Sequence, residues 1–72
     1  MKESNMEYWI SRDKDGTLWL FDMKPIKNEN YFSCAVDSNG RWSEEYELKE
    51  YLFPEVAFEN SPQKIKLELI KE

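Results

Sequence analysis

The clearest pattern in this 72-residue chain is an alternation of apolar and charged residues near its end. Ile65, Leu67 and Leu69 alternate with charged neighbours over residues 64–70. Successive side chains of a strand point to opposite faces of a sheet. The alternation therefore predicts a final strand with one buried face and one solvated face.

A β-hairpin is predicted over residues 7–22. Two runs rich in aromatic and apolar side chains, 7–12 and 17–22, flank the sequence Asp13-Lys14-Asp15-Gly16. Strands favour such runs. Aspartate side chains accept hydrogen bonds from nearby amides and glycine adopts a positive φ at little cost, so the intervening residues are typical of a tight turn.

Further strands are predicted in the middle of the chain, after a loop over residues 23–30. Residues 31–36 and 41–44 flank a second turn of the same chemistry, Asp37-Ser38-Asn39-Gly40, with Trp42 as the expected anchor of the strand that follows. Val56 and Phe58 alternate with polar or small residues over 55–59, which predicts another strand before a turn at residues 60–62.

The segment 45–53 fits two patterns. Leu48, Tyr51 and Leu52 have the i, i+3, i+4 spacing of a helical stripe, and Pro54 follows them. Tyr46 and Leu48 also fit the alternation of a strand. We favour a short helix over residues 47–53, ended by the proline.

The predicted fold class is mainly β, a small antiparallel sheet or partly open barrel of about five strands. A class of α+β is the alternative if the helix forms. Residues 1–6 are expected to be a flexible tail, with Met6 as an alternative start, and residues 7–72 a single domain. A domain of this size is expected to be stable by only about 3–5 kcal/mol unless something reinforces it.

The charge is concentrated in the centre of the chain. The formal net charge is -5, and residues 31–60 carry seven acidic side chains against two basic ones. Binding to phosphates requires a basic face, so this balance argues against nucleic acid as the main partner.

Catalytic and metal-binding groups are scarce. The chain has no histidine and a single cysteine, Cys34, which excludes an internal disulfide and leaves too few ligands for a zinc site. Cys34 is expected to be a small buried hydrophobe in a strand. Asp13-x-Asp15-Gly16 does not match a calcium loop, because Gly16 stands at the fourth position of the loop and Lys24 at the twelfth. We therefore expect no enzyme and no cofactor.

Candidate binding residues are aromatic or acidic. Trp9 and Trp19 share the predicted hairpin and are expected on one face, opposite Ile10 and Leu20, where they either contact a partner or complete the core. The acidic candidates for contact with a partner are Glu44, Glu45 and Glu47. A solvated acidic face is the alternative for these glutamates.

Two stretches of the chain resemble a group of small uncharacterised proteins encoded by bacteriophages and mobile elements of gut-associated bacteria. The first stretch is Tyr8-Trp9-Ile10-x-Arg12-Asp13-Lys14-Asp15-Gly16 with Leu18-Trp19-Leu20, and the second runs from Leu52-Phe53-Pro54-Glu55-Val56 to Asn60-Ser61-Pro62-Gln63-Lys64. Residues 27–51 do not take part in the resemblance. It implies a phage-like accessory product in a bacterial cytoplasm and transfers no activity.

The leading functional hypothesis is a non-enzymatic module that binds a protein or associates with itself, since a sheet edge or the Trp9 and Trp19 face offers a contact surface. The alternative is related to nucleic acid. It is either a single-strand binder that combines aromatic rings with Lys14, Lys24 and Lys27, or an acidic mimic of nucleic acid. Neither hypothesis implies a membrane or a small-molecule substrate.

Overall fold

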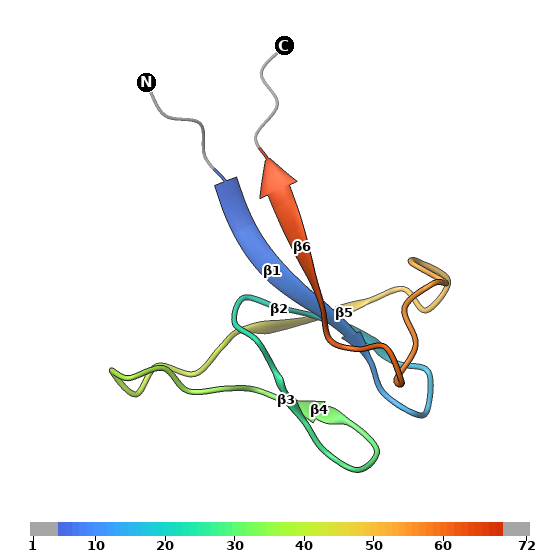
Figure 1. Cartoon of the computed structure of the whole chain (residues 1–72), viewed down its shortest axis with the longest axis horizontal. Coiled ribbons are helices and arrows are strands. Elements are labelled where there is room, and N and C mark those ends of the chain that lie inside the picture. Colours follow the sequence, from blue (N-terminus) through green and yellow to red (C-terminus); the bar gives the residue numbers. More distant parts are fainter. Residues whose placement is uncertain (1–4, 69–72) are drawn as a thin grey trace.

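The computed structural model describes residues 5–68, which form strands joined by turns and loops (Figure 1). Four strands make an antiparallel sheet, in the spatial order β5 (Glu45–Leu48), β2 (Leu18–Phe21), β1 (Asn5–Arg12) and β6 (Gln63–Glu68). A separate two-stranded ribbon contains β3 (Ile26–Lys27) and β4 (Phe32–Ser33). The mainly β prediction is confirmed, and the sheet stays open instead of closing into a barrel.

The hairpin of β1 and β2 forms as predicted. The amide of Asp13 donates to the carbonyl of Thr17 at 2.9 Å, and the amide of Gly16 donates to the carbonyl of Asp13 at 3.0 Å. Gly16 has a φ of 99°, which glycine adopts without the steric cost of a Cβ. The turn therefore fixes the register in which Ile10 lies opposite Leu20.

The first strand is longer than expected. β1 begins at Asn5, and Asn5 and Met6 pair with Glu68 and Leu67 of β6. These two residues were predicted to belong to a tail, whose remaining residues 1–4 lie outside the described range. The final strand is confirmed as β6, which begins at Gln63, and the expected strand residues 69 and 70 also lie outside that range.

The sheet has one apolar face that carries a small core. Ile10 and Leu18 are buried there against Val56, with Leu20, Leu48 and Ile65 packed around them. On the opposite face Phe21 is fully buried, and in the separate ribbon Phe32 is buried with its ring centroid 5.5 Å from that of Phe58. Burial of apolar surface on both faces stabilises the sheet.

Arg12 holds the long connection between β5 and β6. Its five guanidinium N–H groups donate to main-chain carbonyls at 2.6–3.1 Å, those of Val56, Gly16, Glu50, Leu52 and Phe53. An arginine side chain has five such donors, so all of them are used. One side chain at the end of β1 thus fixes a segment some 40 residues further along the chain.

Two expectations for the second half of the chain are wrong. The predicted helix over 47–53 is absent from the described residues, because β5 continues through Leu48 and turns follow it. The predicted strand over 55–59 is a turn region, in which the side chain of Asn60 accepts from the amide of Ala57 and donates to the carbonyl of Glu55. The side-chain amide of Asn60 thus bonds main-chain groups that a neighbouring strand would bond if residues 55–59 were a strand.

The predicted strands over 31–36 and 41–44 are only partly formed. β4 covers just Phe32–Ser33, and the second turn closes a narrow hairpin through a single bridge between Val36 and Trp42. We call residues 36–42 the distal hairpin. Trp42 is 66% exposed and does not anchor a strand as predicted, because the distal hairpin extends beyond the sheet (Figure 1).

The molecule is flat for its length. Its radius of gyration is 13.2 Å, and its shortest dimension is 17 Å. A compact chain of this length has a radius of gyration of about 11 Å. The thin shape buries few side chains and leaves several large apolar ones exposed, which are Ile26, Tyr31, Val36, Trp42, Tyr46, Tyr51, Leu52 and Phe53.

Candidate protein-binding edge

β5 is an edge strand whose outer side is open. β2 pairs with one side of it, and among the described residues no strand pairs with the other. The amide of Asp22 donates to the carbonyl of Glu44, which makes these residues a hydrogen-bonded pair of the ladder. Such pairs alternate along an antiparallel ladder, so the main-chain groups of Glu45 and Glu47 point away from β2. We call this outer side of residues 45–48 the β5 edge.

Side chains on the β5 edge divide between the two faces of the sheet. Glu45 and Glu47 lie opposite Phe21 and Trp19 of β2, on the face that also carries Trp9. Tyr46 and Leu48 lie on the apolar-core face, and Tyr46 is 47% exposed. The edge therefore presents two carboxylates on one face and an accessible aromatic ring on the other.

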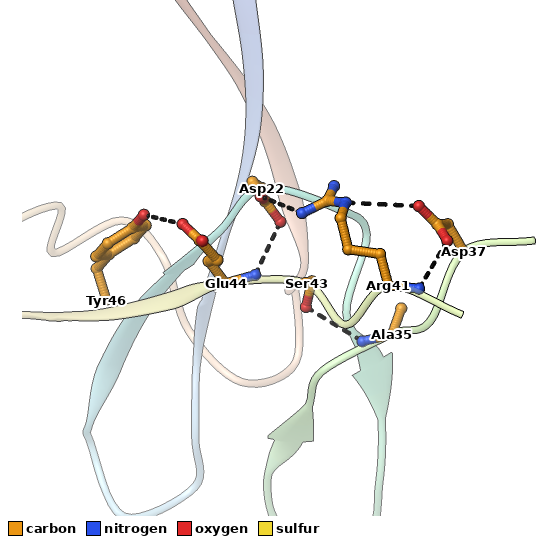
Figure 2. Close-up of polar contacts among 7 residues, drawn as sticks. All are labelled: Asp22, Ala35, Asp37, Arg41, Ser43, Glu44 and Tyr46. Atoms are coloured by element: carbon orange, nitrogen blue, oxygen red, sulfur yellow. Dashed lines mark hydrogen bonds and ion pairs between the residues drawn. The ribbon is translucent and has the colours of Figure 1, made fainter. Parts of the chain in front are cut away.

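The start of β5 is held by an ion-pair network (Figure 2). The guanidinium of Arg41 lies 3.3 Å from a carboxylate oxygen of Asp22 and 3.5 Å from one of Asp37. The other carboxylate oxygen of Asp22 accepts from the amide of Glu44 at 3.0 Å. The network thus fixes the distal hairpin to β2 and sets where the open part of β5 begins.

Main-chain bonds mark the limit of the open edge. The amide of Ser43 donates to the carbonyl of Ala35 at 2.8 Å, and the hydroxyl of Ser43 accepts from the amide of Ala35 at 3.2 Å. Ser43 is therefore already paired, and Glu45 is the first residue of β5 with free outward main-chain groups.

The network shifts the protonation of its members. Hydrogen bonds from the amides of Arg41 and Asn39 lower the pKa of Asp37, and the bond from Arg41 to Asp22 raises the pKa of the Arg41 guanidinium. The hydroxyl of Tyr46 donates to Glu44, which raises the pKa of the tyrosine. All of these groups hold their ordinary charges at neutral pH.

Cys34 is partly exposed and not the buried hydrophobe that its position suggested. Its thiol donates to a carboxylate oxygen of Glu45, with the sulfur and oxygen 2.9 Å apart. Burial and this hydrogen bond both raise the pKa of the thiol. A thiol that stays protonated is a poor nucleophile, so Cys34 serves here as a donor to β5.

The five candidate residues from the sequence separate into four environments. Glu45 and Glu47 lie on the β5 edge, while Glu44 precedes the strand and bonds Tyr46. Trp19 is half-buried beside Glu47 and donates its Nε1–H to Asp13 at 3.1 Å. Trp9 lies further across the sheet.

The ring of Trp9 is covered by cations. The ammonium groups of Lys24 and Lys64 lie 5.5 Å and 5.4 Å from its centroid. As the sequence predicted, Trp9 and Trp19 share one face opposite Ile10 and Leu20. The structure does not bring Trp9 to the β5 edge.

Sequence reasoning missed the exposed aromatic rings that precede and follow β5 in the sequence. Trp42 was taken for a strand anchor and Tyr51 for part of a helix, yet they are 66% and 75% exposed. At the end of β5, residues 47–50 line a shallow open depression. The position of a tyrosine or tryptophan relative to a sheet edge depends on long-range pairing, which local patterns do not contain.

No protein-family model, curated protein or solved structure matches this chain. In the described part of the chain, no group of three or more acidic, cysteine or histidine side chains is arranged to hold a metal ion. The described residues also contain no helix long and apolar enough to cross a membrane. Any functional conclusion must therefore come from the geometry of the β5 edge and its surroundings.

Proposed function

We propose that this protein is a non-enzymatic protein-binding module that adds an extended segment of its partner to the β5 edge. The observation that carries the proposal is the outward orientation of the main-chain groups of Glu45 and Glu47. An exposed edge strand is a template for pairing with another strand. In such complexes the main-chain bonds supply affinity and the alternate side chains supply specificity.

The charge on the edge defines the partner. The cross-strand neighbour of Glu45 or Glu47 on an added strand stands within about 5.5 Å of it, where an opposite charge is stabilising and a like charge is not. We infer that the partner carries lysine or arginine at alternate positions. The exposed rings of Tyr46, on the face of the sheet opposite the two carboxylates, and of Trp42, on the distal hairpin, supply apolar contact area for the partner.

The flat shape of the molecule gives independent support. A radius of gyration of 13.2 Å and an exposed set of large apolar side chains are features of a chain that gains burial from a partner. The chain has no histidine, and its cysteine is held protonated, which favours binding over catalysis.

The resemblance to phage and mobile-element proteins fits an accessory role and no more. Its two stretches meet in the structure, since Arg12 of the first bonds the carbonyls of Leu52, Phe53 and Val56 of the second. These residues hold the fold together. The β5 edge lies within residues 27–51, outside the resemblance, so its partner has to be found by experiment.

Binding of two peptides tests the proposal. One probe is a ten-residue peptide that alternates lysine and valine, and its matched control alternates glutamate and valine. With ¹⁵N-labelled protein at 150 mM salt, we expect the lysine peptide to shift the amide signals of Glu45 and Glu47, and the glutamate peptide to leave them in place. Equal shifts from both peptides, or none from either, would overturn the proposal.

A second candidate function is single-strand nucleic-acid binding around Trp9 and Phe58, away from the β5 edge. It is favoured by the lysines around two rings: Lys24 and Lys64 at Trp9, and Lys14 and Lys27 at 5.2 Å and 4.6 Å from the centroid of Phe58. Rings beside cations suit stacked bases and phosphates. Salt-sensitive binding of a twelve-nucleotide oligothymidine, measured by tryptophan fluorescence, would support it, and unchanged fluorescence at 20 mM salt would exclude it.

A further inference from the structure

We propose that the strand added to the β5 edge comes from a second copy of this protein and is its β6. This inference rests on the proposed function and names the partner. β5 and β6 are the two outer strands of the sheet, so a copy placed beside another in the same orientation brings β6 of one next to β5 of the other. The four strands alternate in direction, and these two strands therefore meet antiparallel.

The main-chain groups of β6 match those of β5. Asp13 and Thr17 form a hydrogen-bonded pair of the hairpin, and such pairs alternate along the ladder. The main-chain groups of Trp9 and Ser11 therefore point toward β2, while those of Tyr8 and Ile10 point toward β6. The amide of Arg12 donates to the hydroxyl of Ser61 at 3.1 Å, in step with that alternation. The partners of Ile10 and Tyr8 in β6 point inward, which leaves the main-chain groups of Lys64 and Lys66 pointing outward.

The side chains are complementary as well. Lys64 lies opposite Trp9, on the same face of the sheet as Glu45 and Glu47. Lys64 and Lys66 are exposed, and the ion pair of Lys64 with Glu7 at 3.4 Å is at the surface. When outward-facing residues pair, Lys66 of one copy stands opposite Glu45 of the other, and Lys64 stands opposite Glu47.

This register has two further consequences. It sets Ile65 of one copy opposite Tyr46 of the other on the apolar-core face, where the ring of Tyr46 is accessible. It also pairs all four residues of β5 with residues 63–66 and stops where Ser43 is already bonded to Ala35. Apolar contact on one face and charge pairing on the other favour the same alignment.

Pairing of two β5 edges with each other is disfavoured. Only outward-facing residues can form the hydrogen-bonded pairs of a new ladder, and on β5 these are Glu45 and Glu47. Every such register places glutamate opposite glutamate, which destabilises a strand pair. The contact between β5 and β6 joins different surfaces, so it does not close on a dimer and growth continues from copy to copy.

The experiment is sedimentation velocity of the full chain from 10 µM to 1 mM at 150 mM salt. We expect the wild-type mass to rise with concentration beyond that of a dimer. The charge-reversed variants E45K/E47K and K64E/K66E each remove the complementarity at one edge, and we expect association at least roughly tenfold weaker for either alone. E55K/E59K, which reverses two exposed glutamates away from the sheet edges, is the matched control and should associate as the wild type does.

Mixing gives the decisive outcome. E45K/E47K has two basic edges and K64E/K66E two acidic ones, so an equimolar mixture restores opposite charges at every contact. Large species that form in the mixture, but not in either variant by itself, support the inference. A wild type that stays monomeric at 1 mM, or a closed dimer that E45K/E47K leaves intact, overturns it.

The two proposals fail in distinguishable ways. K64E/K66E keeps its β5 edge, and the peptide of alternating lysine and valine should still shift its Glu45 and Glu47 amides. If that peptide binds while the wild type stays monomeric, the partner is another protein and only the second-copy inference is wrong. If the peptide does not bind and the wild type stays monomeric, the proposed function and the second-copy inference are both wrong. Circular dichroism and E47K alone, which leaves the bond from Cys34 to Glu45 in place, control for misfolding.

Discussion

Two arginines hold the two irregular parts of this molecule, and they do so in opposite ways. Arg12 turns all five donors inward to carbonyls, and its side chain has no carboxylate partner among the described residues. Arg41 lies at the surface between Asp22 and Asp37. The first arrangement satisfies main-chain groups that have no ladder partner, while the second is an exposed ion-pair network open to solvent and salt.

The contrast suggests a division of labour. We call the Arg12 side, with Asp13 and residues 49–56, the closed end, and the β5 edge with the distal hairpin the open end. Polar groups at the closed end bond within the chain and support stability. The open end keeps free main-chain groups, carboxylates and exposed rings, which we assign to binding. Substitutions at the two ends should therefore affect different measurements.

Removing the guanidinium of Arg12 should have the largest effect. Arg12→Ala leaves five carbonyls without their donor, and we expect a loss of roughly 2–4 kcal/mol in the free energy of unfolding. That is comparable with the whole stability of about 3–5 kcal/mol expected for so small a domain. Urea unfolding followed by tryptophan fluorescence measures it. Arg41→Ala is the matched control, with an expected loss below about 1 kcal/mol. Equal losses in the two variants would break the contrast between the ends.

Asp13 should come next. One oxygen of its carboxylate accepts from the amide of Phe32 at 3.0 Å and the other from Nε1 of Trp19 at 3.1 Å, so Asp13 ties the ribbon to the hairpin. We expect Asp13→Ala to cost about 1–2 kcal/mol, since two partly buried donors lose their acceptor. Asp13→Asn keeps one acceptor oxygen and should lose less. If Asp13→Ala is as stable as the wild type, the bonds of Asp13 do not contribute to the stability of the closed end.

Ser11 is an exception at the closed end that sharpens the rule. Its side chain is fully buried, and its hydroxyl has no hydrogen-bond partner within the described residues. Replacing serine by alanine removes the unpaired buried hydroxyl, and with it a desolvation penalty. Ser11→Ala should therefore leave stability unchanged or raise it by up to about 1 kcal/mol in the same urea experiment. A loss of more than about 1 kcal/mol in the free energy of unfolding would indicate that the hydroxyl is hydrogen-bonded.

Acid should loosen the open end locally. The pKa of Asp37 is lowered by hydrogen bonds from the amides of Arg41 and Asn39, so the folded hairpin favours the carboxylate. The stabilisation is present above the ordinary pKa of 3.8 and is lost as the pH falls through the lower folded value. The amide signals of residues 38–42 should move in that window in an NMR titration. In Asp37→Asn the movement should be absent, and its persistence would assign it to another group.

The smallest effect on stability is expected at the β5 edge. Glu47 is exposed and makes no ion pair among the described residues, so Glu47→Lys should change the free energy of unfolding by less than about 0.5 kcal/mol. The same substitution should weaken association, because it places lysine opposite Lys64 of a second copy. Parallel loss of stability and association would show that the edge belongs to the fold.

The hairpin turns and the final strand could be predicted because their determinants are local. Asp13 and Gly16 fix the first turn, and the alternation around Ile65 fixes the face of β6. The role of Arg12 could not be predicted, since a long side chain bonds carbonyls about 40 residues away and leaves no periodic signal. The bonds of Asn60 to Ala57 and Glu55, together with the bond from Arg12 to Val56, hold residues 55–59 in turns despite their alternation.

The sequence predicted which acidic residues belong to the candidate site but not where in the fold they lie. Glu45 and Glu47 were expected in an acidic segment, but their position on an edge follows from the pairing of β5 with β2, a long-range contact. Trp42 looked like an anchor because large rings usually fill cores. It lies instead on a hairpin that projects past the sheet, so most of the side chain stays exposed.

Amide hydrogen exchange at the β5 edge tests the central claim most directly. It is measured on ¹⁵N-labelled wild type at 20 µM and at 1 mM. We predict that the amides of Glu45, Glu47, Lys64 and Lys66 exchange freely in the dilute protein and become protected together in the concentrated one, while Arg12-side amides keep the same protection. Edge amides that are already protected at 20 µM, or that stay unprotected at 1 mM, would contradict an open β5 edge that binds β6 of a second copy.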